Sequence, residues 1–203
     1  MRKNNFILRG RGRRVGSVLH IYCEGETEEA YLRAYRRFKG YSCCEIERSH
    51  HTDPVGLVEE AIKAKEGAPA SDVFWVAYDL EDVSLGNKHQ AHAEACRLAL
   101  DNGIHVALSA ISIEVWILLH FTSTPKKYLN SDGAVRALKK HLPNYEKGSE
   151  NVFNAIRHLI PEARKNAAIL RRRWERDCPD EKPYDLNPST SFHLLLDAID
   201  QLK

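Results

Sequence analysis

The pattern of hydrophobic positions divides the first 121 residues into alternating strand and helix segments. Short runs rich in β-branched and aromatic residues, typical of buried parallel strands, cover residues 18–22, 72–79 and 104–109, and a weakly alternating segment at 42–48 predicts one more strand. Segments with apolar residues at helical spacing follow them, over residues 27–38, 53–65, 88–102 and 113–121. This alternation predicts an α/β fold with right-handed crossovers and a mainly parallel, Rossmann-like sheet that has helices on both faces.

The pattern changes at residue 122. The remaining chain has no strand signal, and its helical segments are separated by loops rich in proline and glycine. We expect four helices there, over residues 131–141, 149–160, 161–176 and 189–202. The sequence therefore predicts three parts, namely a basic N-terminal arm at 1–15, an α/β core at 16–121 and a helical C-terminal subdomain at 122–203.

Three of the predicted helices carry a start signal in their first residues. Asp53 and Pro54 form a favourable helix start, because aspartate accepts bonds from free backbone amides and proline suits the first helical position. Thr27 is expected to cap the helix after the first strand, and Ser112 the apolar helix that follows the fourth.

The net charge of +2 conceals two basic segments. The first fourteen residues carry six Arg or Lys residues and no acid, and a second basic run spans residues 164–176. Together with acids in the middle of the chain, these segments suggest an anionic partner such as nucleic acid. A solubilising tail and a solvated helix face remain the alternatives.

Cysteine usage and hydropathy indicate the compartment. The five cysteines include no Cys-x-x-Cys pair, and no secretory signal precedes them, so we expect a reducing environment. No apolar run approaches the length of a membrane span. We therefore predict a cytoplasmic protein without membrane association.

Acidic side chains follow two of the predicted strands. Glu24 and Gly25 end the first strand at a tight turn, and Asp79, Glu81 and Asp82 follow the third. The carboxyl ends of parallel strands meet at one edge of the sheet, where ligands bind in open α/β folds. Acids this close together need cations or have raised pKa values, and a divalent hard cation such as Mg²⁺ or Mn²⁺ is the simplest partner.

Two further acids belong to the same expected edge. Glu28 lies in the first turn of the helix after the first strand, and Glu114 lies in the first turn of the apolar helix at 113–121. The simpler alternatives are a helix-dipole or capping role for these glutamates and a solvated loop for the acids after the third strand. For His120, near the end of the apolar helix, an ordinary helix-end histidine is favoured over a metal ligand.

Three segments together resemble the RloB family, whose members are similar to TOPRIM domains and are encoded in bacterial restriction and phage-defence loci. The segments are Ile-Tyr-Cys-Glu-Gly-Glu-Thr-Glu at 21–28, Trp-Val-Ala-Tyr-Asp-Leu-Glu-Asp at 75–82 and Ser-Ala-Ile-Ser-Ile-Glu-Val-Trp-Ile-Leu-Leu-His-Phe at 109–121. The ending Asn-Pro-Ser-Thr-Ser at 187–191 is also similar, so the likeness covers nearly the whole chain. It implies a TOPRIM-like fold.

The resemblance implies metal-dependent cleavage of phosphodiester bonds in DNA or RNA. Glu24 and Asp79 match the first-strand glutamate and the first aspartate of TOPRIM sites, and Glu81 stands where the second aspartate is usual. Asp79 and Glu81 would hold one ion, while Glu24 would hold a second ion or act as general base. Supporting ligands would be Glu28, Asp82 and Glu114. Candidates for phosphate or nucleic-acid contact are Lys126, Lys127, Arg172, Arg173 and Arg176.

Two other functions remain open from the sequence. A regulatory subunit could retain the acids and bind nucleic acid or a nucleotide without turnover, and the same acids could transfer a phosphoryl group to or from a nucleotide. The chain has no Walker-type Gly-rich loop with lysine, so a partner ATPase or restriction-system protein would supply ATP hydrolysis if it is needed. A homo-oligomer is also possible.

Overall fold

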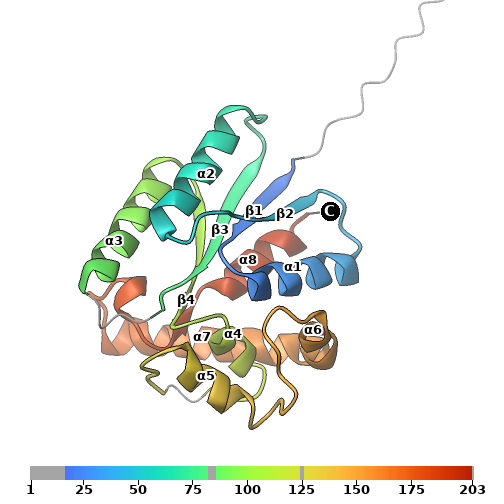
Figure 1. Ribbon diagram of the computed structural model, residues 1–203, viewed down its shortest axis with the longest axis vertical. Helices are drawn as coiled ribbons and strands as arrows, with labels where there is room; N and C mark the ends of the chain where they lie inside the picture. Colours follow the sequence, from blue (N-terminus) through green and yellow to red (C-terminus); the bar gives the residue numbers. More distant parts are fainter. Residues whose placement is uncertain (1–16, 82–85, 124–125, 203) are drawn as a thin grey trace, which may run out of the picture.

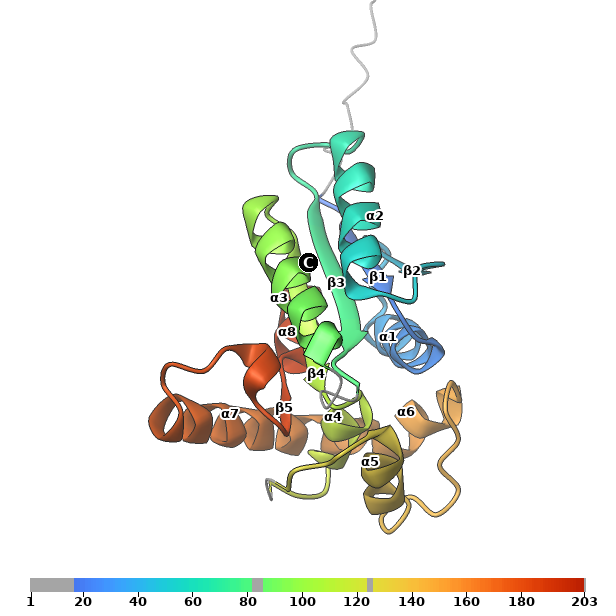
Figure 2. The same ribbon diagram turned by 60° about the vertical axis from the view of Figure 1, so that its left-hand side comes forward.

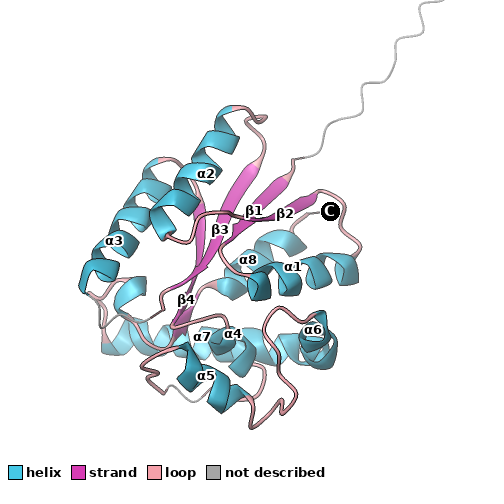
Figure 3. Cartoon of the chain, in the orientation of Figure 1, coloured by secondary structure: helices cyan, strands magenta, loops and turns pink. Residues whose placement is uncertain are grey.

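The computed structural model describes residues 17–81, 86–123 and 126–202, and these form a five-stranded sheet in the order β2-β1-β3-β4-β5. The first four strands are parallel (Figures 1 and 3), whereas β5, labelled in Figure 2, pairs antiparallel with β4 at one edge. The strands are β1 Leu19–Cys23, β2 Cys44–Arg48, β3 Val73–Asp79, β4 His105–Ala110 and β5 Ser189–Thr190. The predicted α/β class and mainly parallel sheet are confirmed.

Helices cover both faces of the sheet because successive strand residues point to opposite sides. Ile21 belongs to a core with α1 (Glu26–Lys39) and the C-terminal helices, whereas its neighbour Tyr22 belongs to a core with α2 (Pro54–Glu66) and α3 (Gly86–Asp101). Figures 1 and 2 show α2 and α3 together on one face and α1 and α8 (Phe192–Asp200) on the other. No helix of the described residues is long and apolar enough to cross a membrane.

The C-terminal region is mainly helical, as predicted, and it packs on the sheet. After α4 (Glu114–Leu118), which lies within the predicted core, the helices are α5 Ser131–Leu138, α6 Glu150–Ile156, α7 Ile160–Asp177 and α8, with short 3-10 turns at 157–159 and 183–185. Tyr31 of α1 meets Phe153 and Phe192 edge to face, with ring centroids 5.3 and 5.6 Å apart. One hydrophobic core therefore continues from the sheet into these helices.

Two of the predicted element boundaries in this region are wrong. The segment expected to begin a helix at Ser189 first forms β5, where the Thr190 and Ser109 hydroxyls lie 2.9 Å apart. Two paired residues leave no alternating pattern in the sequence, because their pairing depends on the edge of β4. The apolar segment 113–121 is helical only over Glu114–Leu118, and turns follow it.

Two of the three predicted caps are also wrong. Asp53 does cap α2, because its carboxylate accepts the Gly56 N–H at 2.8 Å. Thr27, however, lies inside α1, and its hydroxyl accepts the N–H of Gly148 at 3.1 Å, a contact from a distant loop. Ser112 uses its carbonyl, not its hydroxyl, to accept the Val115 N–H at 2.9 Å.

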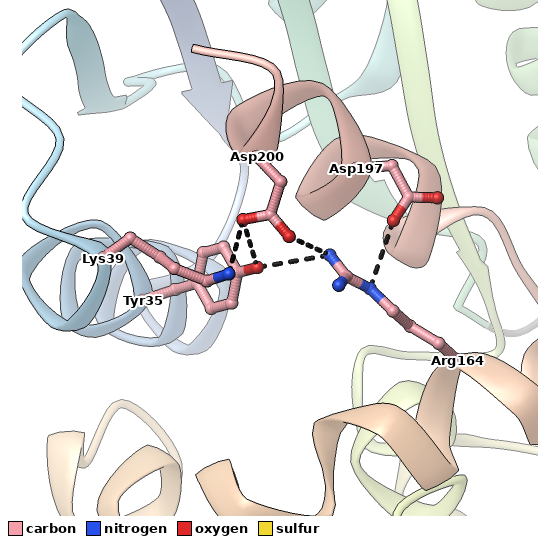
Figure 4. A network of polar contacts seen from close by, with 5 residues as sticks. All are labelled: Tyr35, Lys39, Arg164, Asp197 and Asp200. Carbon is pink, nitrogen blue, oxygen red and sulfur yellow. Dashed lines mark hydrogen bonds and ion pairs between the residues drawn. The ribbon is translucent and has the colours of Figure 1, made fainter. Parts of the chain in front are cut away.

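A polar network around Arg164 joins α1, α7 and α8 (Figure 4). The guanidinium donates to Asp200 at 2.9 Å and to the Tyr35 hydroxyl at 3.2 Å, and it pairs with Asp197 at 3.1 Å. Asp200 also accepts from Tyr35 at 2.7 Å and pairs with Lys39 at 2.8 Å. Arg164, the first residue of the second basic run, is therefore part of the fold's internal bonding.

We expect Arg164→Met to destabilise the protein by about 1–2 kcal/mol, because it leaves two carboxylates without their shared partner. The figure is lower than for a fully buried pair, since the Arg164 side chain is 28% exposed and water screens the charges. Urea unfolding measures the change. Arg172→Met, which removes an exposed arginine of the same helix, is the control and should change stability by less than about 0.5 kcal/mol.

His120 is a buried histidine at the end of the apolar segment. Its ring lies between main-chain and hydroxyl groups, with Nδ1 3.1 Å from the Ile117 carbonyl oxygen and Nε2 3.3 Å from the Tyr31 hydroxyl. Burial lowers its pKa to about 4. These contacts fit the favoured alternative, an ordinary helix-end histidine.

The lowered pKa of His120 predicts a loss of stability in mild acid. Between pH 6.5 and about 4 the unfolded imidazole binds a proton that the folded one does not, so the free energy of unfolding falls as the pH falls. At about pH 5 this costs about 2 kcal/mol. Urea unfolding of the parent and of His120→Gln at neutral and acidic pH tests it, and equal pH dependence in both proteins would contradict the assignment.

Candidate functional site

Glu24 and Asp79 meet at the carboxyl ends of the central strands β1 and β3. The register aligns Cys23 with Ala77, and the Glu24 N–H continues the ladder by donating to the Ala77 carbonyl at 3.0 Å. In return, the Glu24 carboxylate accepts the Asp79 N–H at 3.1 Å. The parallel pairing of these two strands thus brings residues 55 positions apart into direct contact.

Five acids that the sequence singled out line one hollow of about 180 Å³ at this edge. They are Glu24, Glu28, Asp79, Glu81 and Glu114. The sixth, Asp82, lies outside the described residues. Turns after β1, β3 and β4 and the start of α1 supply these side chains, so the hollow has acids on several sides.

Burial gives two of these carboxyls unusual proton affinity. Burial, together with the charges of Glu24 and Glu114, raises the pKa of Glu28 to about 7. Burial and the neighbouring acids Glu28, Glu114 and Glu24 hold the pKa of Asp79 well above its usual range. Without a cation, the buried pair Glu28 and Asp79 therefore keeps protons that free carboxylates would have lost near neutral pH.

The donor atoms in the hollow fit a hard divalent cation. One oxygen each of Asp79 and Glu114, Oδ1 and Oε2, is buried and has no hydrogen-bond partner among the described residues. A buried carboxylate oxygen without a donor is costly unless a cation or a proton occupies it. Among those residues, no three side chains of the ligating types are already arranged to hold a metal ion, so binding would require the acids to draw together.

Two residues that the sequence analysis did not single out contact Glu114, and one of them, Lys147, lines the hollow. The Tyr145 hydroxyl donates to Glu114 at 2.6 Å, and Lys147 brings its ammonium to 3.9 Å from the same carboxylate oxygen. Both lie on the loop between α5 and α6. Near the end of this loop, Gly148 has a left-handed backbone conformation with φ of 70°, which glycine adopts without strain. Its N–H donates to the Thr27 hydroxyl at 3.1 Å.

Glu81 has a left-handed backbone conformation, with φ of 52°. Its N–H donates to the Ile111 carbonyl at 2.8 Å, which fixes the turn after β3. A side chain in this conformation costs about 1–2 kcal/mol unless the residue is glycine. Such a cost at the rim of an acidic hollow is typical of residues kept for their side chain.

This conformation predicts a measurable difference between two variants that both remove the carboxylate. We expect Glu81→Gly to be more stable than Glu81→Ala by about 1 kcal/mol, because only glycine accepts the positive φ without strain. Thermal or urea unfolding of the two variants measures it. Equal stability, or a more stable alanine variant, would show that the turn relaxes when the side chain is removed.

The basic residues proposed for nucleic-acid contact lie elsewhere. Lys126 and Lys127 are exposed and line none of the hollows that contain the acids. On α7, Arg173 and Arg176 both pair with Asp177, at 3.4 and 2.7 Å. Arg172 is exposed. The structure therefore does not bring these five residues together with the acids, and their contact with nucleic acid stays a prediction.

Two more hollows adjoin the acidic one at Glu24. One of about 580 Å³ extends toward the β2–α2 loop, and one of about 200 Å³ extends toward His92 of α3. A separate, mainly apolar cavity of about 400 Å³ lies beside Trp174 of α7 and Leu194 of α8. None of the predicted site acids lines that cavity.

Comparison with known proteins identifies the family. The family model described as RloB-like protein matches residues 19–199, which include all the described strands and the acids of the hollow. No curated protein and no solved structure matches the chain. Since the match covers most of the sequence, this protein belongs to the RloB-like family.

Proposed function

We propose that this protein is a divalent-metal-dependent nuclease that hydrolyses phosphodiester bonds in DNA or RNA through a TOPRIM-like site. The observation that carries the proposal is the convergence of buried carboxylates with unpartnered oxygens, on Asp79 and Glu114, beside a lysine at the carboxyl edge of a parallel sheet. Such an arrangement suits a cation and a phosphate together.

Asp79, Glu114 and Glu28 would hold the metal at the buried side of the hollow, and Glu81 would reach it from the exposed rim. A bound Mg²⁺ or Mn²⁺ would polarise the phosphate and lower the pKa of an attacking water. Deprotonation of Glu28 and Asp79, whose protons the cation would displace, would accompany its binding.

Glu24 is the best placed of the acids to accept a proton from water. It is only partly buried, it lines all three connected hollows, and its bond to the Asp79 N–H fixes the carboxylate at the edge of the sheet. Lys147 faces the same hollow and would neutralise charge that develops on the phosphate oxygens in the transition state.

The role in phage defence and the partner ATPase or restriction protein belong to the same proposal. They rest on the resemblance to proteins of restriction loci, together with the lack of a Walker-type loop in this sequence. A non-catalytic subunit that binds nucleic acid is the alternative for this site.

The test is cleavage of labelled DNA and RNA pools by the full chain with Mg²⁺, Mn²⁺ or EDTA. Glu24→Gln, which keeps size and hydrogen bonding but removes the charge, should lose metal-dependent cleavage by at least about a hundredfold. Glu59→Gln, on an exposed position of α2, is the control and should cleave like the parent. Binding of nucleic acid without cleavage by any of the three proteins would support the non-catalytic alternative.

A further inference from the structure

The β2–α2 loop forms one wall of the largest hollow beside Glu24. This hollow has a volume of about 580 Å³, and the loop contributes Arg48, Ser49, His50, His51 and Thr52 to its lining. The register pairs Arg48 with Cys23, so the wall begins one residue from Glu24 at the carboxyl edge of the sheet. A strand of nucleic acid whose scissile phosphate lay at Glu24 would meet this wall on its way out of the site.

Three side chains of this wall are basic and uncommitted. Arg48, His50 and His51 are exposed, and within the described residues none of them has an ion pair or a side-chain hydrogen bond. On α7, by contrast, Arg171, Arg173 and Arg176 each pair with an acid of their own helix. Arg172 is exposed but lies outside the hollows around Glu24. Free donors beside the acidic hollow are the groups that a phosphate needs.

The loop is held in place by a set of internal bonds. The Ser49 N–H donates to the Cys23 carbonyl at 2.9 Å, and the His51 N–H donates to the Ser49 hydroxyl at 2.9 Å. The Ser49 hydroxyl in turn donates to Glu60 of α2. The wall is therefore built on the sheet and on α2, which lowers the entropy lost when a ligand binds.

Gly56 makes room for the His51 ring. A Cβ atom at this position would lie 2.5 Å from Nδ1 of His51, so the imidazole packs directly against the first turn of α2. Among the acids that line this hollow, Glu29 already pairs with Arg33 at 2.9 Å, while Glu24 and Glu26 also belong to its lining. The hollow thus has basic side chains on the side of the β2–α2 loop and acids at the start of α1.

We infer that Arg48, His50 and His51 bind the phosphate next to the scissile one, so that the nucleic-acid strand passes from the acidic hollow across the β2–α2 loop. This inference rests on the proposed function for the position of the scissile phosphate. It assigns the main backbone contact to the β2–α2 loop and not to α7.

Binding of a fluorescein-labelled oligo(dT) and oligo(rU), followed by anisotropy over a series of salt concentrations, tests the inference. Arg48→Gln/His51→Gln should weaken binding by about tenfold and reduce the salt slope by about one. The matched control Arg97→Gln/His158→Gln removes the same residue types from exposed positions outside the hollows and should bind like the parent. An uncharged morpholino oligonucleotide should bind parent and wall variant equally.

The outcomes separate the inference from the proposed function. If the wall variant binds like the control, or if Arg172→Gln/Arg176→Gln shows the loss instead, the inference is wrong even when the parent cleaves nucleic acid. If the wall variant loses affinity but the parent cleaves nothing, the phosphate contact holds and the nuclease proposal fails. Melting temperatures of all variants exclude unfolding as the cause, since the replaced side chains are exposed.

Discussion

Asp79→Asn is expected to abolish metal-dependent cleavage and, in metal-free buffer, to stabilise the protein. Asp79 lies between Glu28, Glu114 and Glu24, and their charges and its burial raise its pKa. Removing one carboxyl from this group removes repulsion that the folded state otherwise bears near neutral pH. The loss of activity should reach at least about a thousandfold, because charge stabilisation by a bound ion contributes several kcal/mol.

Asparagine suits the site for a second reason. The Asp79 carboxyl accepts a hydrogen bond from the Ile113 backbone and shares a side-chain hydrogen bond with Glu28. The amide of asparagine keeps an oxygen that accepts from Ile113, and its NH₂ group can donate to Glu28. We therefore expect a gain on the order of 2 kcal/mol above neutral pH, using the free energy of one pKa unit.

The gain in stability from Asp79→Asn should depend on pH. The folded carboxyls have pKa values above those of the unfolded chain, so below about pH 4 both states are protonated and the repulsion disappears. Urea unfolding in EDTA should thus show parent and variant converging as the pH falls. Added Mg²⁺ should raise the melting temperature of the parent and not of the variant. A variant that is less stable at every pH would contradict the account.

The central fold and the meeting of the acids could be predicted from sequence because both depend on local patterns. The strands β1, β3 and β4 show their own apolar runs, and the carboxyl ends of parallel strands lie at one edge, so Glu24 and Asp79 were expected at the same edge. Their direct contact follows from the adjacency of β1 and β3 in the sheet, which the alternation of strands and helices does not specify.

Other features depend on contacts between distant segments and leave no local signal. In the sequence, Arg164 belongs to a basic run, yet its ion-pair partners Asp197 and Asp200 lie on a helix more than thirty residues later. Thr27 resembles a helix cap, yet a loop more than a hundred residues away occupies its hydroxyl. Polar side chains of this kind acquire their roles from tertiary packing, which overrides the local preference.

Lys147 is the most consequential of these unpredicted residues. It stands on a loop with no periodic pattern, and its place beside Glu114 follows only from the packing of α5 against α4 and of α6 against α1. The two lysines proposed from sequence, Lys126 and Lys127, were chosen because they follow the apolar helix closely. Closeness to the apolar helix in the sequence therefore did not identify the lysine that lies beside Glu114 in the fold.

Lys147→Met should lower kcat by about a hundredfold with little change in KM, because the ammonium would act on charge that develops in the transition state. Stability should change little, since the Lys147 side chain is 51% exposed and its pairing with Glu114 is long, at 3.9 Å. Lys147→Arg should restore part of the activity, because it returns the charge on a longer side chain.

Two further variants decide between the lysines. Lys140→Met removes an exposed lysine outside the hollow and is the control for a general loss of positive charge. Lys126→Met/Lys127→Met tests the pair that the sequence favoured. If this pair shows the kcat loss while Lys147→Met behaves like Lys140→Met, charge neutralisation comes from the segment after α4. If Lys147→Met raises KM alone, its ammonium binds the ground state as strongly as the transition state and contributes no rate acceleration.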